Sequence, residues 1–199
     1  RIKRGDDKKA PKLALKSAIF VAAILMPIQI LVGDQHGLNT LEHQPQKVAA
    51  MEAAWETQQG LPLVLFAVPD EQERTNHLEI AIPNGASLIL THELHGEVKG
   101  LNEFEGKHPP VAPVFYAFRI MLVTGMLMLM LSWFVSFTIL RGKDLSKPLL
   151  SGLMFMTFSG WVATIAGWYV TEIGRQPYLV SGILKTADAV TTLPSGNVL

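Results

Sequence analysis

Three long apolar runs alternate with polar segments along the chain. Each is free of charged residues over 17 to 24 positions, and they are Ser17–Gly33, Ile120–Leu140 and Pro148–Thr171. A helix crosses the hydrocarbon core of a bilayer with about 20 apolar residues, so each run is long enough for one crossing. With their flanks, the runs predict transmembrane helices at 13–33, 113–140 and 148–172.

The segment between the first two runs has a different pattern. Helix-favouring residues dominate "HQPQKVAAMEAAWETQ" at 43–58, and Pro45 stands where a first helical turn begins. "LPLVLFAVP" and "HLEIAIP" are short and bounded by proline, which predicts a strand pair, and "PNGAS" predicts a turn. The predicted fold class is therefore an all-α integral membrane protein: three transmembrane helices of a larger helical bundle, with a mixed extracytoplasmic loop.

The charges are sorted along the chain although they sum to zero. Seven Lys or Arg residues precede the first run, and Arg141, Lys143 and Lys147 lie in the short link between the second and third. Cytoplasmic segments carry an excess of Lys and Arg, which predicts cytoplasmic segments at 1–12 and 141–147. The loop 34–112 and the segment 173–199 are then expected on the periplasmic side of a bacterial inner membrane.

Composition narrows the possible chemistry. The chain is 49% apolar and only 17% charged, unlike an ordinary soluble domain. It has no cysteine, which excludes disulfides, thiolate-bound zinc, iron–sulfur clusters and covalently attached c-type haem. No basic stripe suggests a nucleic-acid partner. All six histidines lie between residues 36 and 108, so the predicted membrane helices carry no histidine for a haem.

Two of these histidines, His92 and His95, lie three residues apart in "HELH". A helix would point both toward one metal ion. The motif lacks a third ligand and its surroundings also fit a turn, so the favoured interpretation is a pair of solvated loop residues.

Glu172 follows directly on the third apolar run, where an unpaired charge is costly. Arg175 lies three residues on, which allows a helix-end salt bridge if the helix continues. Alternatively, Glu172 is a ligand or proton acceptor, and "GRQP" breaks the helix so that backbone groups can meet a cofactor. The residues themselves leave both interpretations open.

Met121 lies near the start of the second run, two residues after Arg119. A methionine in an apolar helix usually packs against its neighbours. Its position near the outer end also fits a haem that takes the thioether on iron and the guanidinium near a propionate.

Three motifs resemble one family. "GWYVTEIGRQPY" at 167–178 is similar to the last haem-bearing segment of subunit I of the cytochrome bd quinol oxidases, which has the form GW-x-x-x-E-x-GRQPW. "PVFYAFRIM" resembles that family's methionine-bearing helix start, and "QKVAAMEAAWETQ" resembles its periplasmic quinol loop, in the same order. Tyr178 stands in place of the usual tryptophan, and the stretch before "PVFYAF" is short, which indicates the short-loop branch.

The resemblance implies haem contacts for five residues. Met121 would be an axial ligand of a low-spin haem b, with Arg119 nearby. Glu172 would be a ligand for high-spin haems, Trp168 would lie beside those haems, and Arg175 would hold a propionate. The short loop leaves haem d and high-spin haem b as alternatives at the oxygen site.

The same resemblance implies a quinol site and a reaction. Lys47 and Glu52 would act in the quinol loop, where a carboxylate takes a proton as quinol gives up electrons. The chain would then be part of a terminal respiratory oxidase, a quinol:oxygen oxidoreductase that reduces oxygen to water and generates a membrane potential. Expected partners are the N-terminal part of subunit I, subunit II, membrane lipid, quinol and oxygen.

The match covers only the later part of the family's subunit. We therefore expect the chain to be a piece that is not active alone, with the family's histidine ligands in an earlier helical bundle. Two rival hypotheses come from other classes of protein. One is a transporter segment that uses Glu172 and Arg175 for substrate or proton binding, and the other is a helix-packing subunit without a cofactor.

Overall fold

The computed structural model describes residues 9–189. Residues 1–8 of the predicted basic segment and 190–199 of the predicted final segment therefore lie outside the described part of the chain. The chain forms two compact units. Within the described residues, the helical unit comprises 9–37 and 118–167, and the loop unit comprises 38–117 and 168–189.

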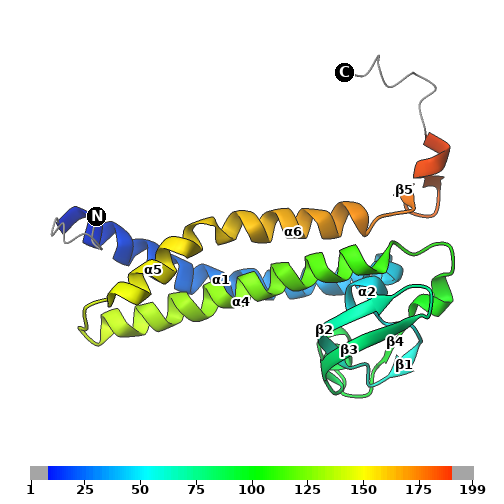
Figure 1. Ribbon diagram of the computed structural model, residues 1–199, viewed down its shortest axis with the longest axis horizontal. Coiled ribbons are helices and arrows are strands. Elements are labelled where there is room, and N and C mark those ends of the chain that lie inside the picture. Colours follow the sequence, from blue (N-terminus) through cyan, green and yellow to red (C-terminus); the bar gives the residue numbers. More distant parts are fainter. Residues whose placement is uncertain (1–8, 190–199) are drawn as a thin grey trace, which may run out of the picture. The chain divides into compact units, whose positions relative to one another are not determined.

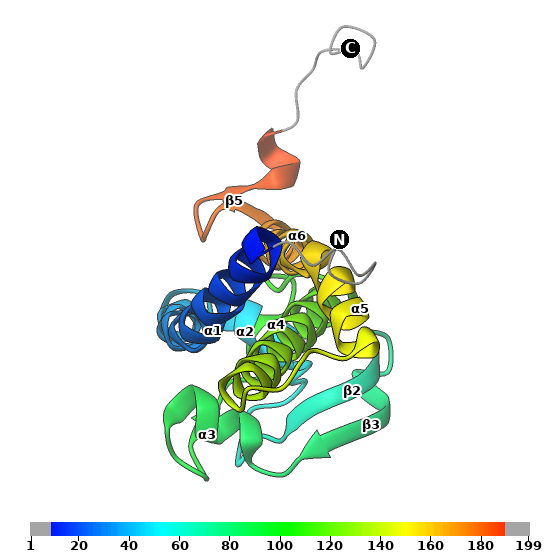
Figure 2. The same cartoon turned by 90° about the vertical axis from the view of Figure 1, so that its left-hand side faces the viewer.

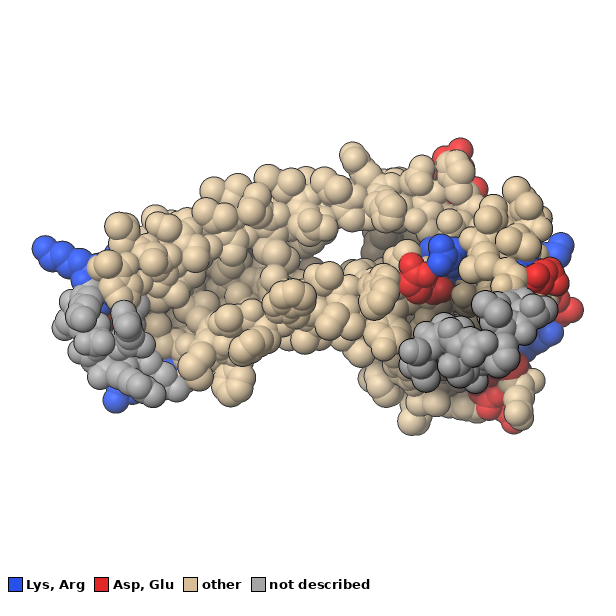
Figure 3. Space-filling view, turned by 90° about the horizontal axis from the view of Figure 1, so that it is seen from above, with Lys and Arg blue, Asp and Glu red and all other residues tan. Residues whose placement is uncertain are grey.

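Three helical segments are long and apolar enough to cross a membrane, as predicted. They are α1 (Lys9–His43), α4 (Val111–Leu140) and the combined segment Lys147–Ile173 (Figure 1). Most of their large apolar side chains are exposed, which is typical of helices that face lipid or further helices. In Figure 3, red side chains lie over the loop unit, blue side chains lie there and at the far end of the spans, and the face of the spans between is made of other residues.

The first helix is longer than predicted, because α1 continues through the first ten residues of the expected loop. It ends at His43, and Gln44 has φ −141° and ψ 58°. Gln44 precedes Pro45, whose ring disfavours a helical conformation in the residue before it. The break is therefore set by that proline and not by the end of the apolar run.

The third predicted helix is interrupted, which the sequence pattern did not indicate. It consists of α5 (Lys147–Phe155), a 3₁₀ turn η3 (Met156–Phe158) and α6 (Ser159–Ile173). Ser159 Oγ donates to the carbonyl of Met156 at 2.7 Å, and Thr157 Oγ1 to that of Leu153 at 3.4 Å. Hydroxyl groups that bond backward in this way bend helices.

Within the helical unit, α4 contacts the other helices. Trp133 Nε1 donates to the carbonyl of Ala23 in α1 at 2.9 Å. A groove of about 660 Å³ lies between α4 and the α5–α6 segment. It is lined by Thr124, Leu127, Met128, Met130, Leu131, Phe134, Gly152, Phe155, Met156 and Ser159.

The loop unit contains short elements around one main core. Its elements are α2 (Pro45–Glu52), β1 (Gln58–Gln59), β2 (Leu63–Asp70), β3 (Thr75–Ile82), α3 (Gly85–Thr91), β4 (Glu97–Val98), η2 (Leu101–Phe104), β5 (Tyr178–Val180), β6 (Leu184–Lys185) and η4 (Thr186–Ala189). The antiparallel pairs are β1–β4, β2–β3 and β5–β6. The pair β2–β3 confirms the predicted strand pair (Figure 2). The core packs α2 and β2 against the start of α4.

The helix predicted within 43–58 begins at Pro45 as expected but ends earlier than predicted. α2 ends at Glu52, and Ala53 adopts a left-handed conformation with φ 49°. The N–H of Ala54 then bonds to the carbonyl of Ala49 at 2.9 Å, so the reversal satisfies backbone groups while burying both alanines. Burying this turn therefore stabilises the chain more than continuing the helix through the following helix-favouring residues would.

Candidate functional site

Both predicted quinol-loop residues, Lys47 and Glu52, lie on α2 and are buried. Pro45 begins this helix, which packs its alanines into the core of the loop unit. Only 8% of Lys47 and 6% of Glu52 is exposed. Charged side chains are rarely buried unless they have partners, so this burial is unusual for a surface loop.

Lys47 lies against the residues that follow α6. A Cβ atom added to Gly174 would lie 2.9 Å from Cε and 3.0 Å from Cγ of Lys47. Burial lowers the pKa of Lys47, and the positive charge of Arg175 lowers it further, whereas the negative charge of Glu172 raises it. The fold thus brings the quinol-loop lysine to the Glu172–Arg175 segment, a contact that the sequence did not predict.

The pair Glu172–Arg175 is formed although the helix ends between them. α6 ends at Ile173, and Nη2 of Arg175 lies 2.5 Å from Oε2 of Glu172. Nε of Arg175 is buried and has no hydrogen-bond partner within residues 9–189. The salt bridge, one of the two interpretations that the spacing left open, is therefore present, and one donor of the guanidinium is left for a further acceptor.

Met121 lies on α4 in the helical unit, facing Gly167 of α6. A Cβ atom added to Gly167 would lie 3.0 Å from the Met121 sulfur. Arg119 is buried, and its guanidinium carbon lies 5.4 Å from the centre of the Phe118 ring. Trp168 follows Gly167 and is 64% exposed, which leaves its indole available for a contact with another group.

The seven predicted site residues therefore form two groups. Arg119 and Met121 belong to the helical unit, and the loop unit contains the others, Lys47, Glu52, Trp168, Glu172 and Arg175. The sequence pattern did not predict the close approaches at Gly167 and Gly174. Both glycines stand in the "GWYVTEIGRQPY" motif, so the motif was the only available signal for them.

The side chains of Met121, Glu172 and Arg175 carry the kinds of group that bind a haem. Methionine thioether is a haem-iron ligand, and a carboxylate oxygen can bind iron. The unpaired Nε of Arg175 fits a second carboxylate such as a haem propionate, since charge-assisted hydrogen bonds of guanidinium groups are strong.

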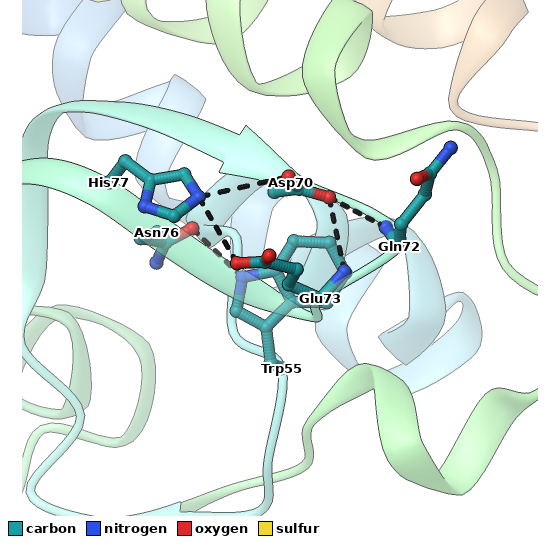
Figure 4. A network of polar contacts seen from close by, with 6 residues as sticks. All are labelled: Trp55, Asp70, Gln72, Glu73, Asn76 and His77. Atoms are coloured by element: carbon teal, nitrogen blue, oxygen red, sulfur yellow. Dashed lines mark hydrogen bonds and ion pairs between the residues drawn. The ribbon is translucent and has the colours of Figure 1, made fainter.

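Two other polar clusters of the loop unit, around His92 and around His77, are separate from the predicted site residues. α3 ends at Thr91, and His92 caps it with φ 59°, so no helix presents His92 and His95 together. A polar network at the tip of the β2–β3 hairpin joins His77 to Asp70 and Glu73 at 3.7 and 3.6 Å (Figure 4). Backbone N–H groups of Glu73 and Gln72 lower the pKa of Asp70, and all three side chains are partly or fully exposed. The network thus stabilises a turn.

The chain is similar to subunits of cytochrome bd oxidases. A family profile for cytochrome bd terminal oxidase subunit I matches residues 1–199. Cytochrome bd ubiquinol oxidase subunit 1 of Bacillus subtilis (strain 168) is 32% identical over 184 residues, which cover 85% of this chain and 39% of the relative. Cytochrome bd-II ubiquinol oxidase subunit 1 of Escherichia coli (strain K12) is 26% identical over 253 residues, covering 93% of this chain and 49% of the relative.

A solved structure is similar over most of the chain. The structure of bd oxidase from Geobacillus thermodenitrificans superposes with a TM-score of 0.80 and 29% sequence identity. The match covers 94% of this chain and 44% of that chain. The chain therefore spans less than half the length of the proteins described here.

Proposed function

Because the chain belongs to the family of cytochrome bd terminal oxidase subunit I, we propose that it is part of a membrane quinol:oxygen oxidoreductase. The complete enzyme would oxidise quinol at the outer membrane surface and reduce oxygen to water. The observation that carries this proposal is the match of the family profile to the whole chain, including the three motifs with their site residues.

We propose that Lys47 and Glu52 act on quinol. Glu52 accepts a proton as quinol is oxidised, and Lys47 provides a positive charge for the quinol oxygen. Support comes from the burial of both side chains on one short helix. Burial strengthens the interaction of each charge with a bound polar group, because the local dielectric constant is lower than in water.

We propose further that Met121 binds a low-spin haem b and Glu172 a high-spin haem. These haems, when bound, supply electron transfer and oxygen reduction. Arg175 holds Glu172 in place through Nη2 and would offer Nε to a propionate, and Trp168 would lie beside the high-spin haems. Arg119 adds a positive charge near Met121.

The oxygen site of this enzyme would hold a high-spin haem b or haem d. The E. coli relative aligns over 253 residues, more than the 199 of this chain, so it contains additional residues within the matched region. This excess is consistent with a shorter loop in the present chain. Pyridine haemochrome analysis of the complete oxidase would distinguish the two haem types.

The proposed enzyme generates a membrane potential without pumping protons. Quinol protons leave on the outer side, and the protons for water come from the cytoplasm. The expected partners are the rest of subunit I, subunit II and lipid. Reconstitution of the complete oxidase in vesicles should give a potential, positive outside, when quinol and oxygen are added.

The test of the haem assignment compares two methionines of α4. In the complete oxidase, Met121→Leu is expected to alter the absorption and spin state of the low-spin haem. Met128→Leu is the matched control, because Met128 lies on the same helix and lines the apolar groove. Glu172→Gln should change the high-spin haem spectrum only.

Three results would overturn the proposal. An intact membrane complex without haem absorption would favour a transporter. Unchanged spectra in both Met121→Leu and Glu172→Gln would favour a helix-packing subunit. Equal spectral changes in Met121→Leu and Met128→Leu would show that Met121 acts through packing.

A further inference from the structure

The chain reverses direction immediately after Glu52, the residue proposed to accept the quinol proton. α2 ends at Glu52, and Ala53 has φ 49°, a left-handed conformation that is uncommon for a residue with a side chain. Ala53 and Ala54 are 2% and 3% exposed, so the reversal lies in the core of the loop unit. A conformation of this kind persists only where the surrounding structure holds it. The contacts of the reversal therefore determine where α2 ends.

Asn76 of β3 makes two of these contacts. Nδ2 of Asn76 donates to the carbonyl of Ala53 at 3.1 Å. Nε1 of Trp55 donates to Oδ1 of Asn76 at 2.8 Å, as Figure 4 shows. Asn76 is more than twenty residues away from both partners in the chain, so both bonds are tertiary contacts. One side-chain amide thus joins the two residues on either side of Ala54.

The chemistry of the partners fixes the orientation of this amide and the type of residue. An indole N–H can only donate and a carbonyl can only accept, so an oxygen must face Trp55 and a nitrogen must face Ala53. Nδ2 also donates to Oε2 of Glu79, an exposed residue, at 3.2 Å. Asn76 therefore uses its acceptor and both of its donors. An aspartate of nearly the same shape would keep the bond from Trp55 but could not donate to Ala53.

The strand pair holds the backbone of Asn76 in place. Asn76 is the register partner of Pro69 in β2, and the pairs on either side of them follow without a bulge. The bonds from Asn76 to Trp55 and to Ala53 are both partly buried, so water competes for them less than at the surface. The amide therefore connects a fixed strand to the end of α2.

The reversal in turn holds the last turn of α2. The N–H of Ala53 bonds to the carbonyl of Ala50 at 3.3 Å, and the N–H of Ala54 bonds to that of Ala49 at 2.9 Å. Without such partners the last carbonyl groups of a helix are unsatisfied. Glu52 lies in this turn and precedes Ala53 directly, so a shift of the reversal moves Glu52. Misplacing a catalytic group by about 1 Å can slow a reaction by about 100-fold.

We propose that Asn76 is a positioning residue for quinol oxidation, which holds the reversal at Ala53 and thereby fixes the carboxylate of Glu52 for proton transfer from quinol. In this role Asn76 acts through the backbone and transfers no proton itself. The inference rests on the proposed function of Glu52, and it assigns a reason for the hydrogen bonds between the hairpin and the residues after α2.

The experiment compares two Asn→Asp substitutions in the complete oxidase. Asn76→Asp removes the donor to Ala53. Asn102→Asp is the matched control, because the side chain of Asn102 is held through its oxygen: N and Oγ1 of Thr57 donate to Oδ1 at 3.2 and 3.3 Å. Glu79→Ala removes the exposed partner of Asn76 and tests whether that bond contributes.

Asn76→Asp should lower kcat for quinol oxidation by about 10-fold or more, with little change in the KM for quinol or in the haem absorption spectra. Asn102→Asp and Glu79→Ala should leave kcat nearly unchanged. A normal kcat in Asn76→Asp would contradict the proposal. A raised KM with a normal kcat would do the same, because it would show that Asn76 contributes to quinol binding instead.

A double-mutant cycle separates positioning from a general loss of stability. In the Glu52→Gln background, Asn76→Asp should slow the oxidase much less than in the parent, because the carboxylate that Asn76 positions is already absent. Equal fold-decreases in the two backgrounds would show an effect that is independent of Glu52, and the positioning role would be rejected.

Trp55→Phe keeps the proposal testable if Asn76→Asp does not assemble with its haems. This change removes the indole N–H from the same amide, introduces no charge and should lower kcat several-fold in the same non-additive way. A normal rate in Trp55→Phe would then reject the role of Asn76. The proposed function fails separately: Glu52→Gln at the parent rate would remove the role of Glu52, whereas a slow Glu52→Gln with a normal Asn76→Asp rejects only the positioning.

Discussion

Gly174, directly after α6, lies close to Lys47 of α2. A side chain there would meet Lys47 at 2.9 Å and the carbonyl oxygen of Val170 at 2.3 Å. The glycine of the "GRQ" sequence is therefore required by packing, whatever cofactor the neighbouring residues bind. The same contact places the proposed quinol lysine beside the Glu172–Arg175 pair.

Gly174→Ala should destabilise the loop unit by about 1–3 kcal/mol, because the methyl group overpacks this contact. Thermal unfolding of the complete oxidase measures the effect. Gly160→Ala in α6 is the control, since no atom lies within 4 Å of its added Cβ and alanine favours a helix. Equal unfolding temperatures for the two variants would contradict the close approach.

Lys47→Ala and Glu52→Gln should slow quinol oxidation while the haem spectra persist. For Glu52→Gln, loss of a proton acceptor corresponds to a decrease of about 10²-fold or more in kcat. Steady-state quinol oxidation, with absorption spectra of the same samples, measures both properties. Glu97→Gln, an exposed residue of the same loop, should leave the rate unchanged. Loss of haem in the Lys47 or Glu52 variants would instead indicate a structural role.

Helix α4 begins in the loop unit and bears Met121 further along, in the helical unit. Two hydrogen bonds join the hairpin to the first turns of α4: Val111 N–H to Glu71, and the Tyr116 hydroxyl to Ala67. The side chains of Val111, Val114 and Phe115 pack into the core of the loop unit. None of these tertiary bonds follows from the pattern of the individual segments. The hydrophobic pattern located β2, β3 and α4, but which side chain would cap α4 depended on how the hairpin packs.

Glu71→Ala should destabilise the start of α4 by about 0.5–2 kcal/mol, because the first N–H group of the helix loses its carboxylate partner. Tyr116→Phe should cost about 0.5–1.5 kcal/mol through the bond to Ala67. Hydrogen exchange of the amides at 111–116 measures local opening. Gln72→Ala, in the same turn, should leave that exchange unchanged, and faster exchange in this control would contradict a specific cap.

The whole molecule is divided by polarity into membrane-length helices and a loop unit rich in acidic residues. The short link at 141–147 carries three of the basic residues, and the loop at 34–117 carries twelve acidic residues against four Lys or Arg. This sorting predicts opposite sides of the membrane for the two segments.

Cysteine labelling in intact cells should reveal this topology. Gln59→Cys, exposed in β1, should react with a membrane-impermeant maleimide from outside. Lys143→Cys, in the basic link, should react only after the inner membrane is made permeable. Labelling of position 143 in cells with an intact inner membrane would reverse the assigned orientation.

The sequence by itself determined the three membrane-length helices, the strand pair, the family and the residues expected at its sites. Apolar run length, strand propensity and motif spacing are local properties, so the chain carries them without reference to its fold. The motif also suggested the Glu172–Arg175 pair, whose members are only three residues apart.

Only the tertiary structure decided the end of α2 at Glu52, the 3₁₀ turn in the third span, the contact of Lys47 with Gly174 and the exposure of Leu78 and Ile80 in β3. Each depends on how segments distant in sequence pack together, or on backbone groups that must find partners once buried. Helix and strand propensities contribute less free energy than tertiary packing does. They therefore set the type of most elements but not where the elements end or what they contact.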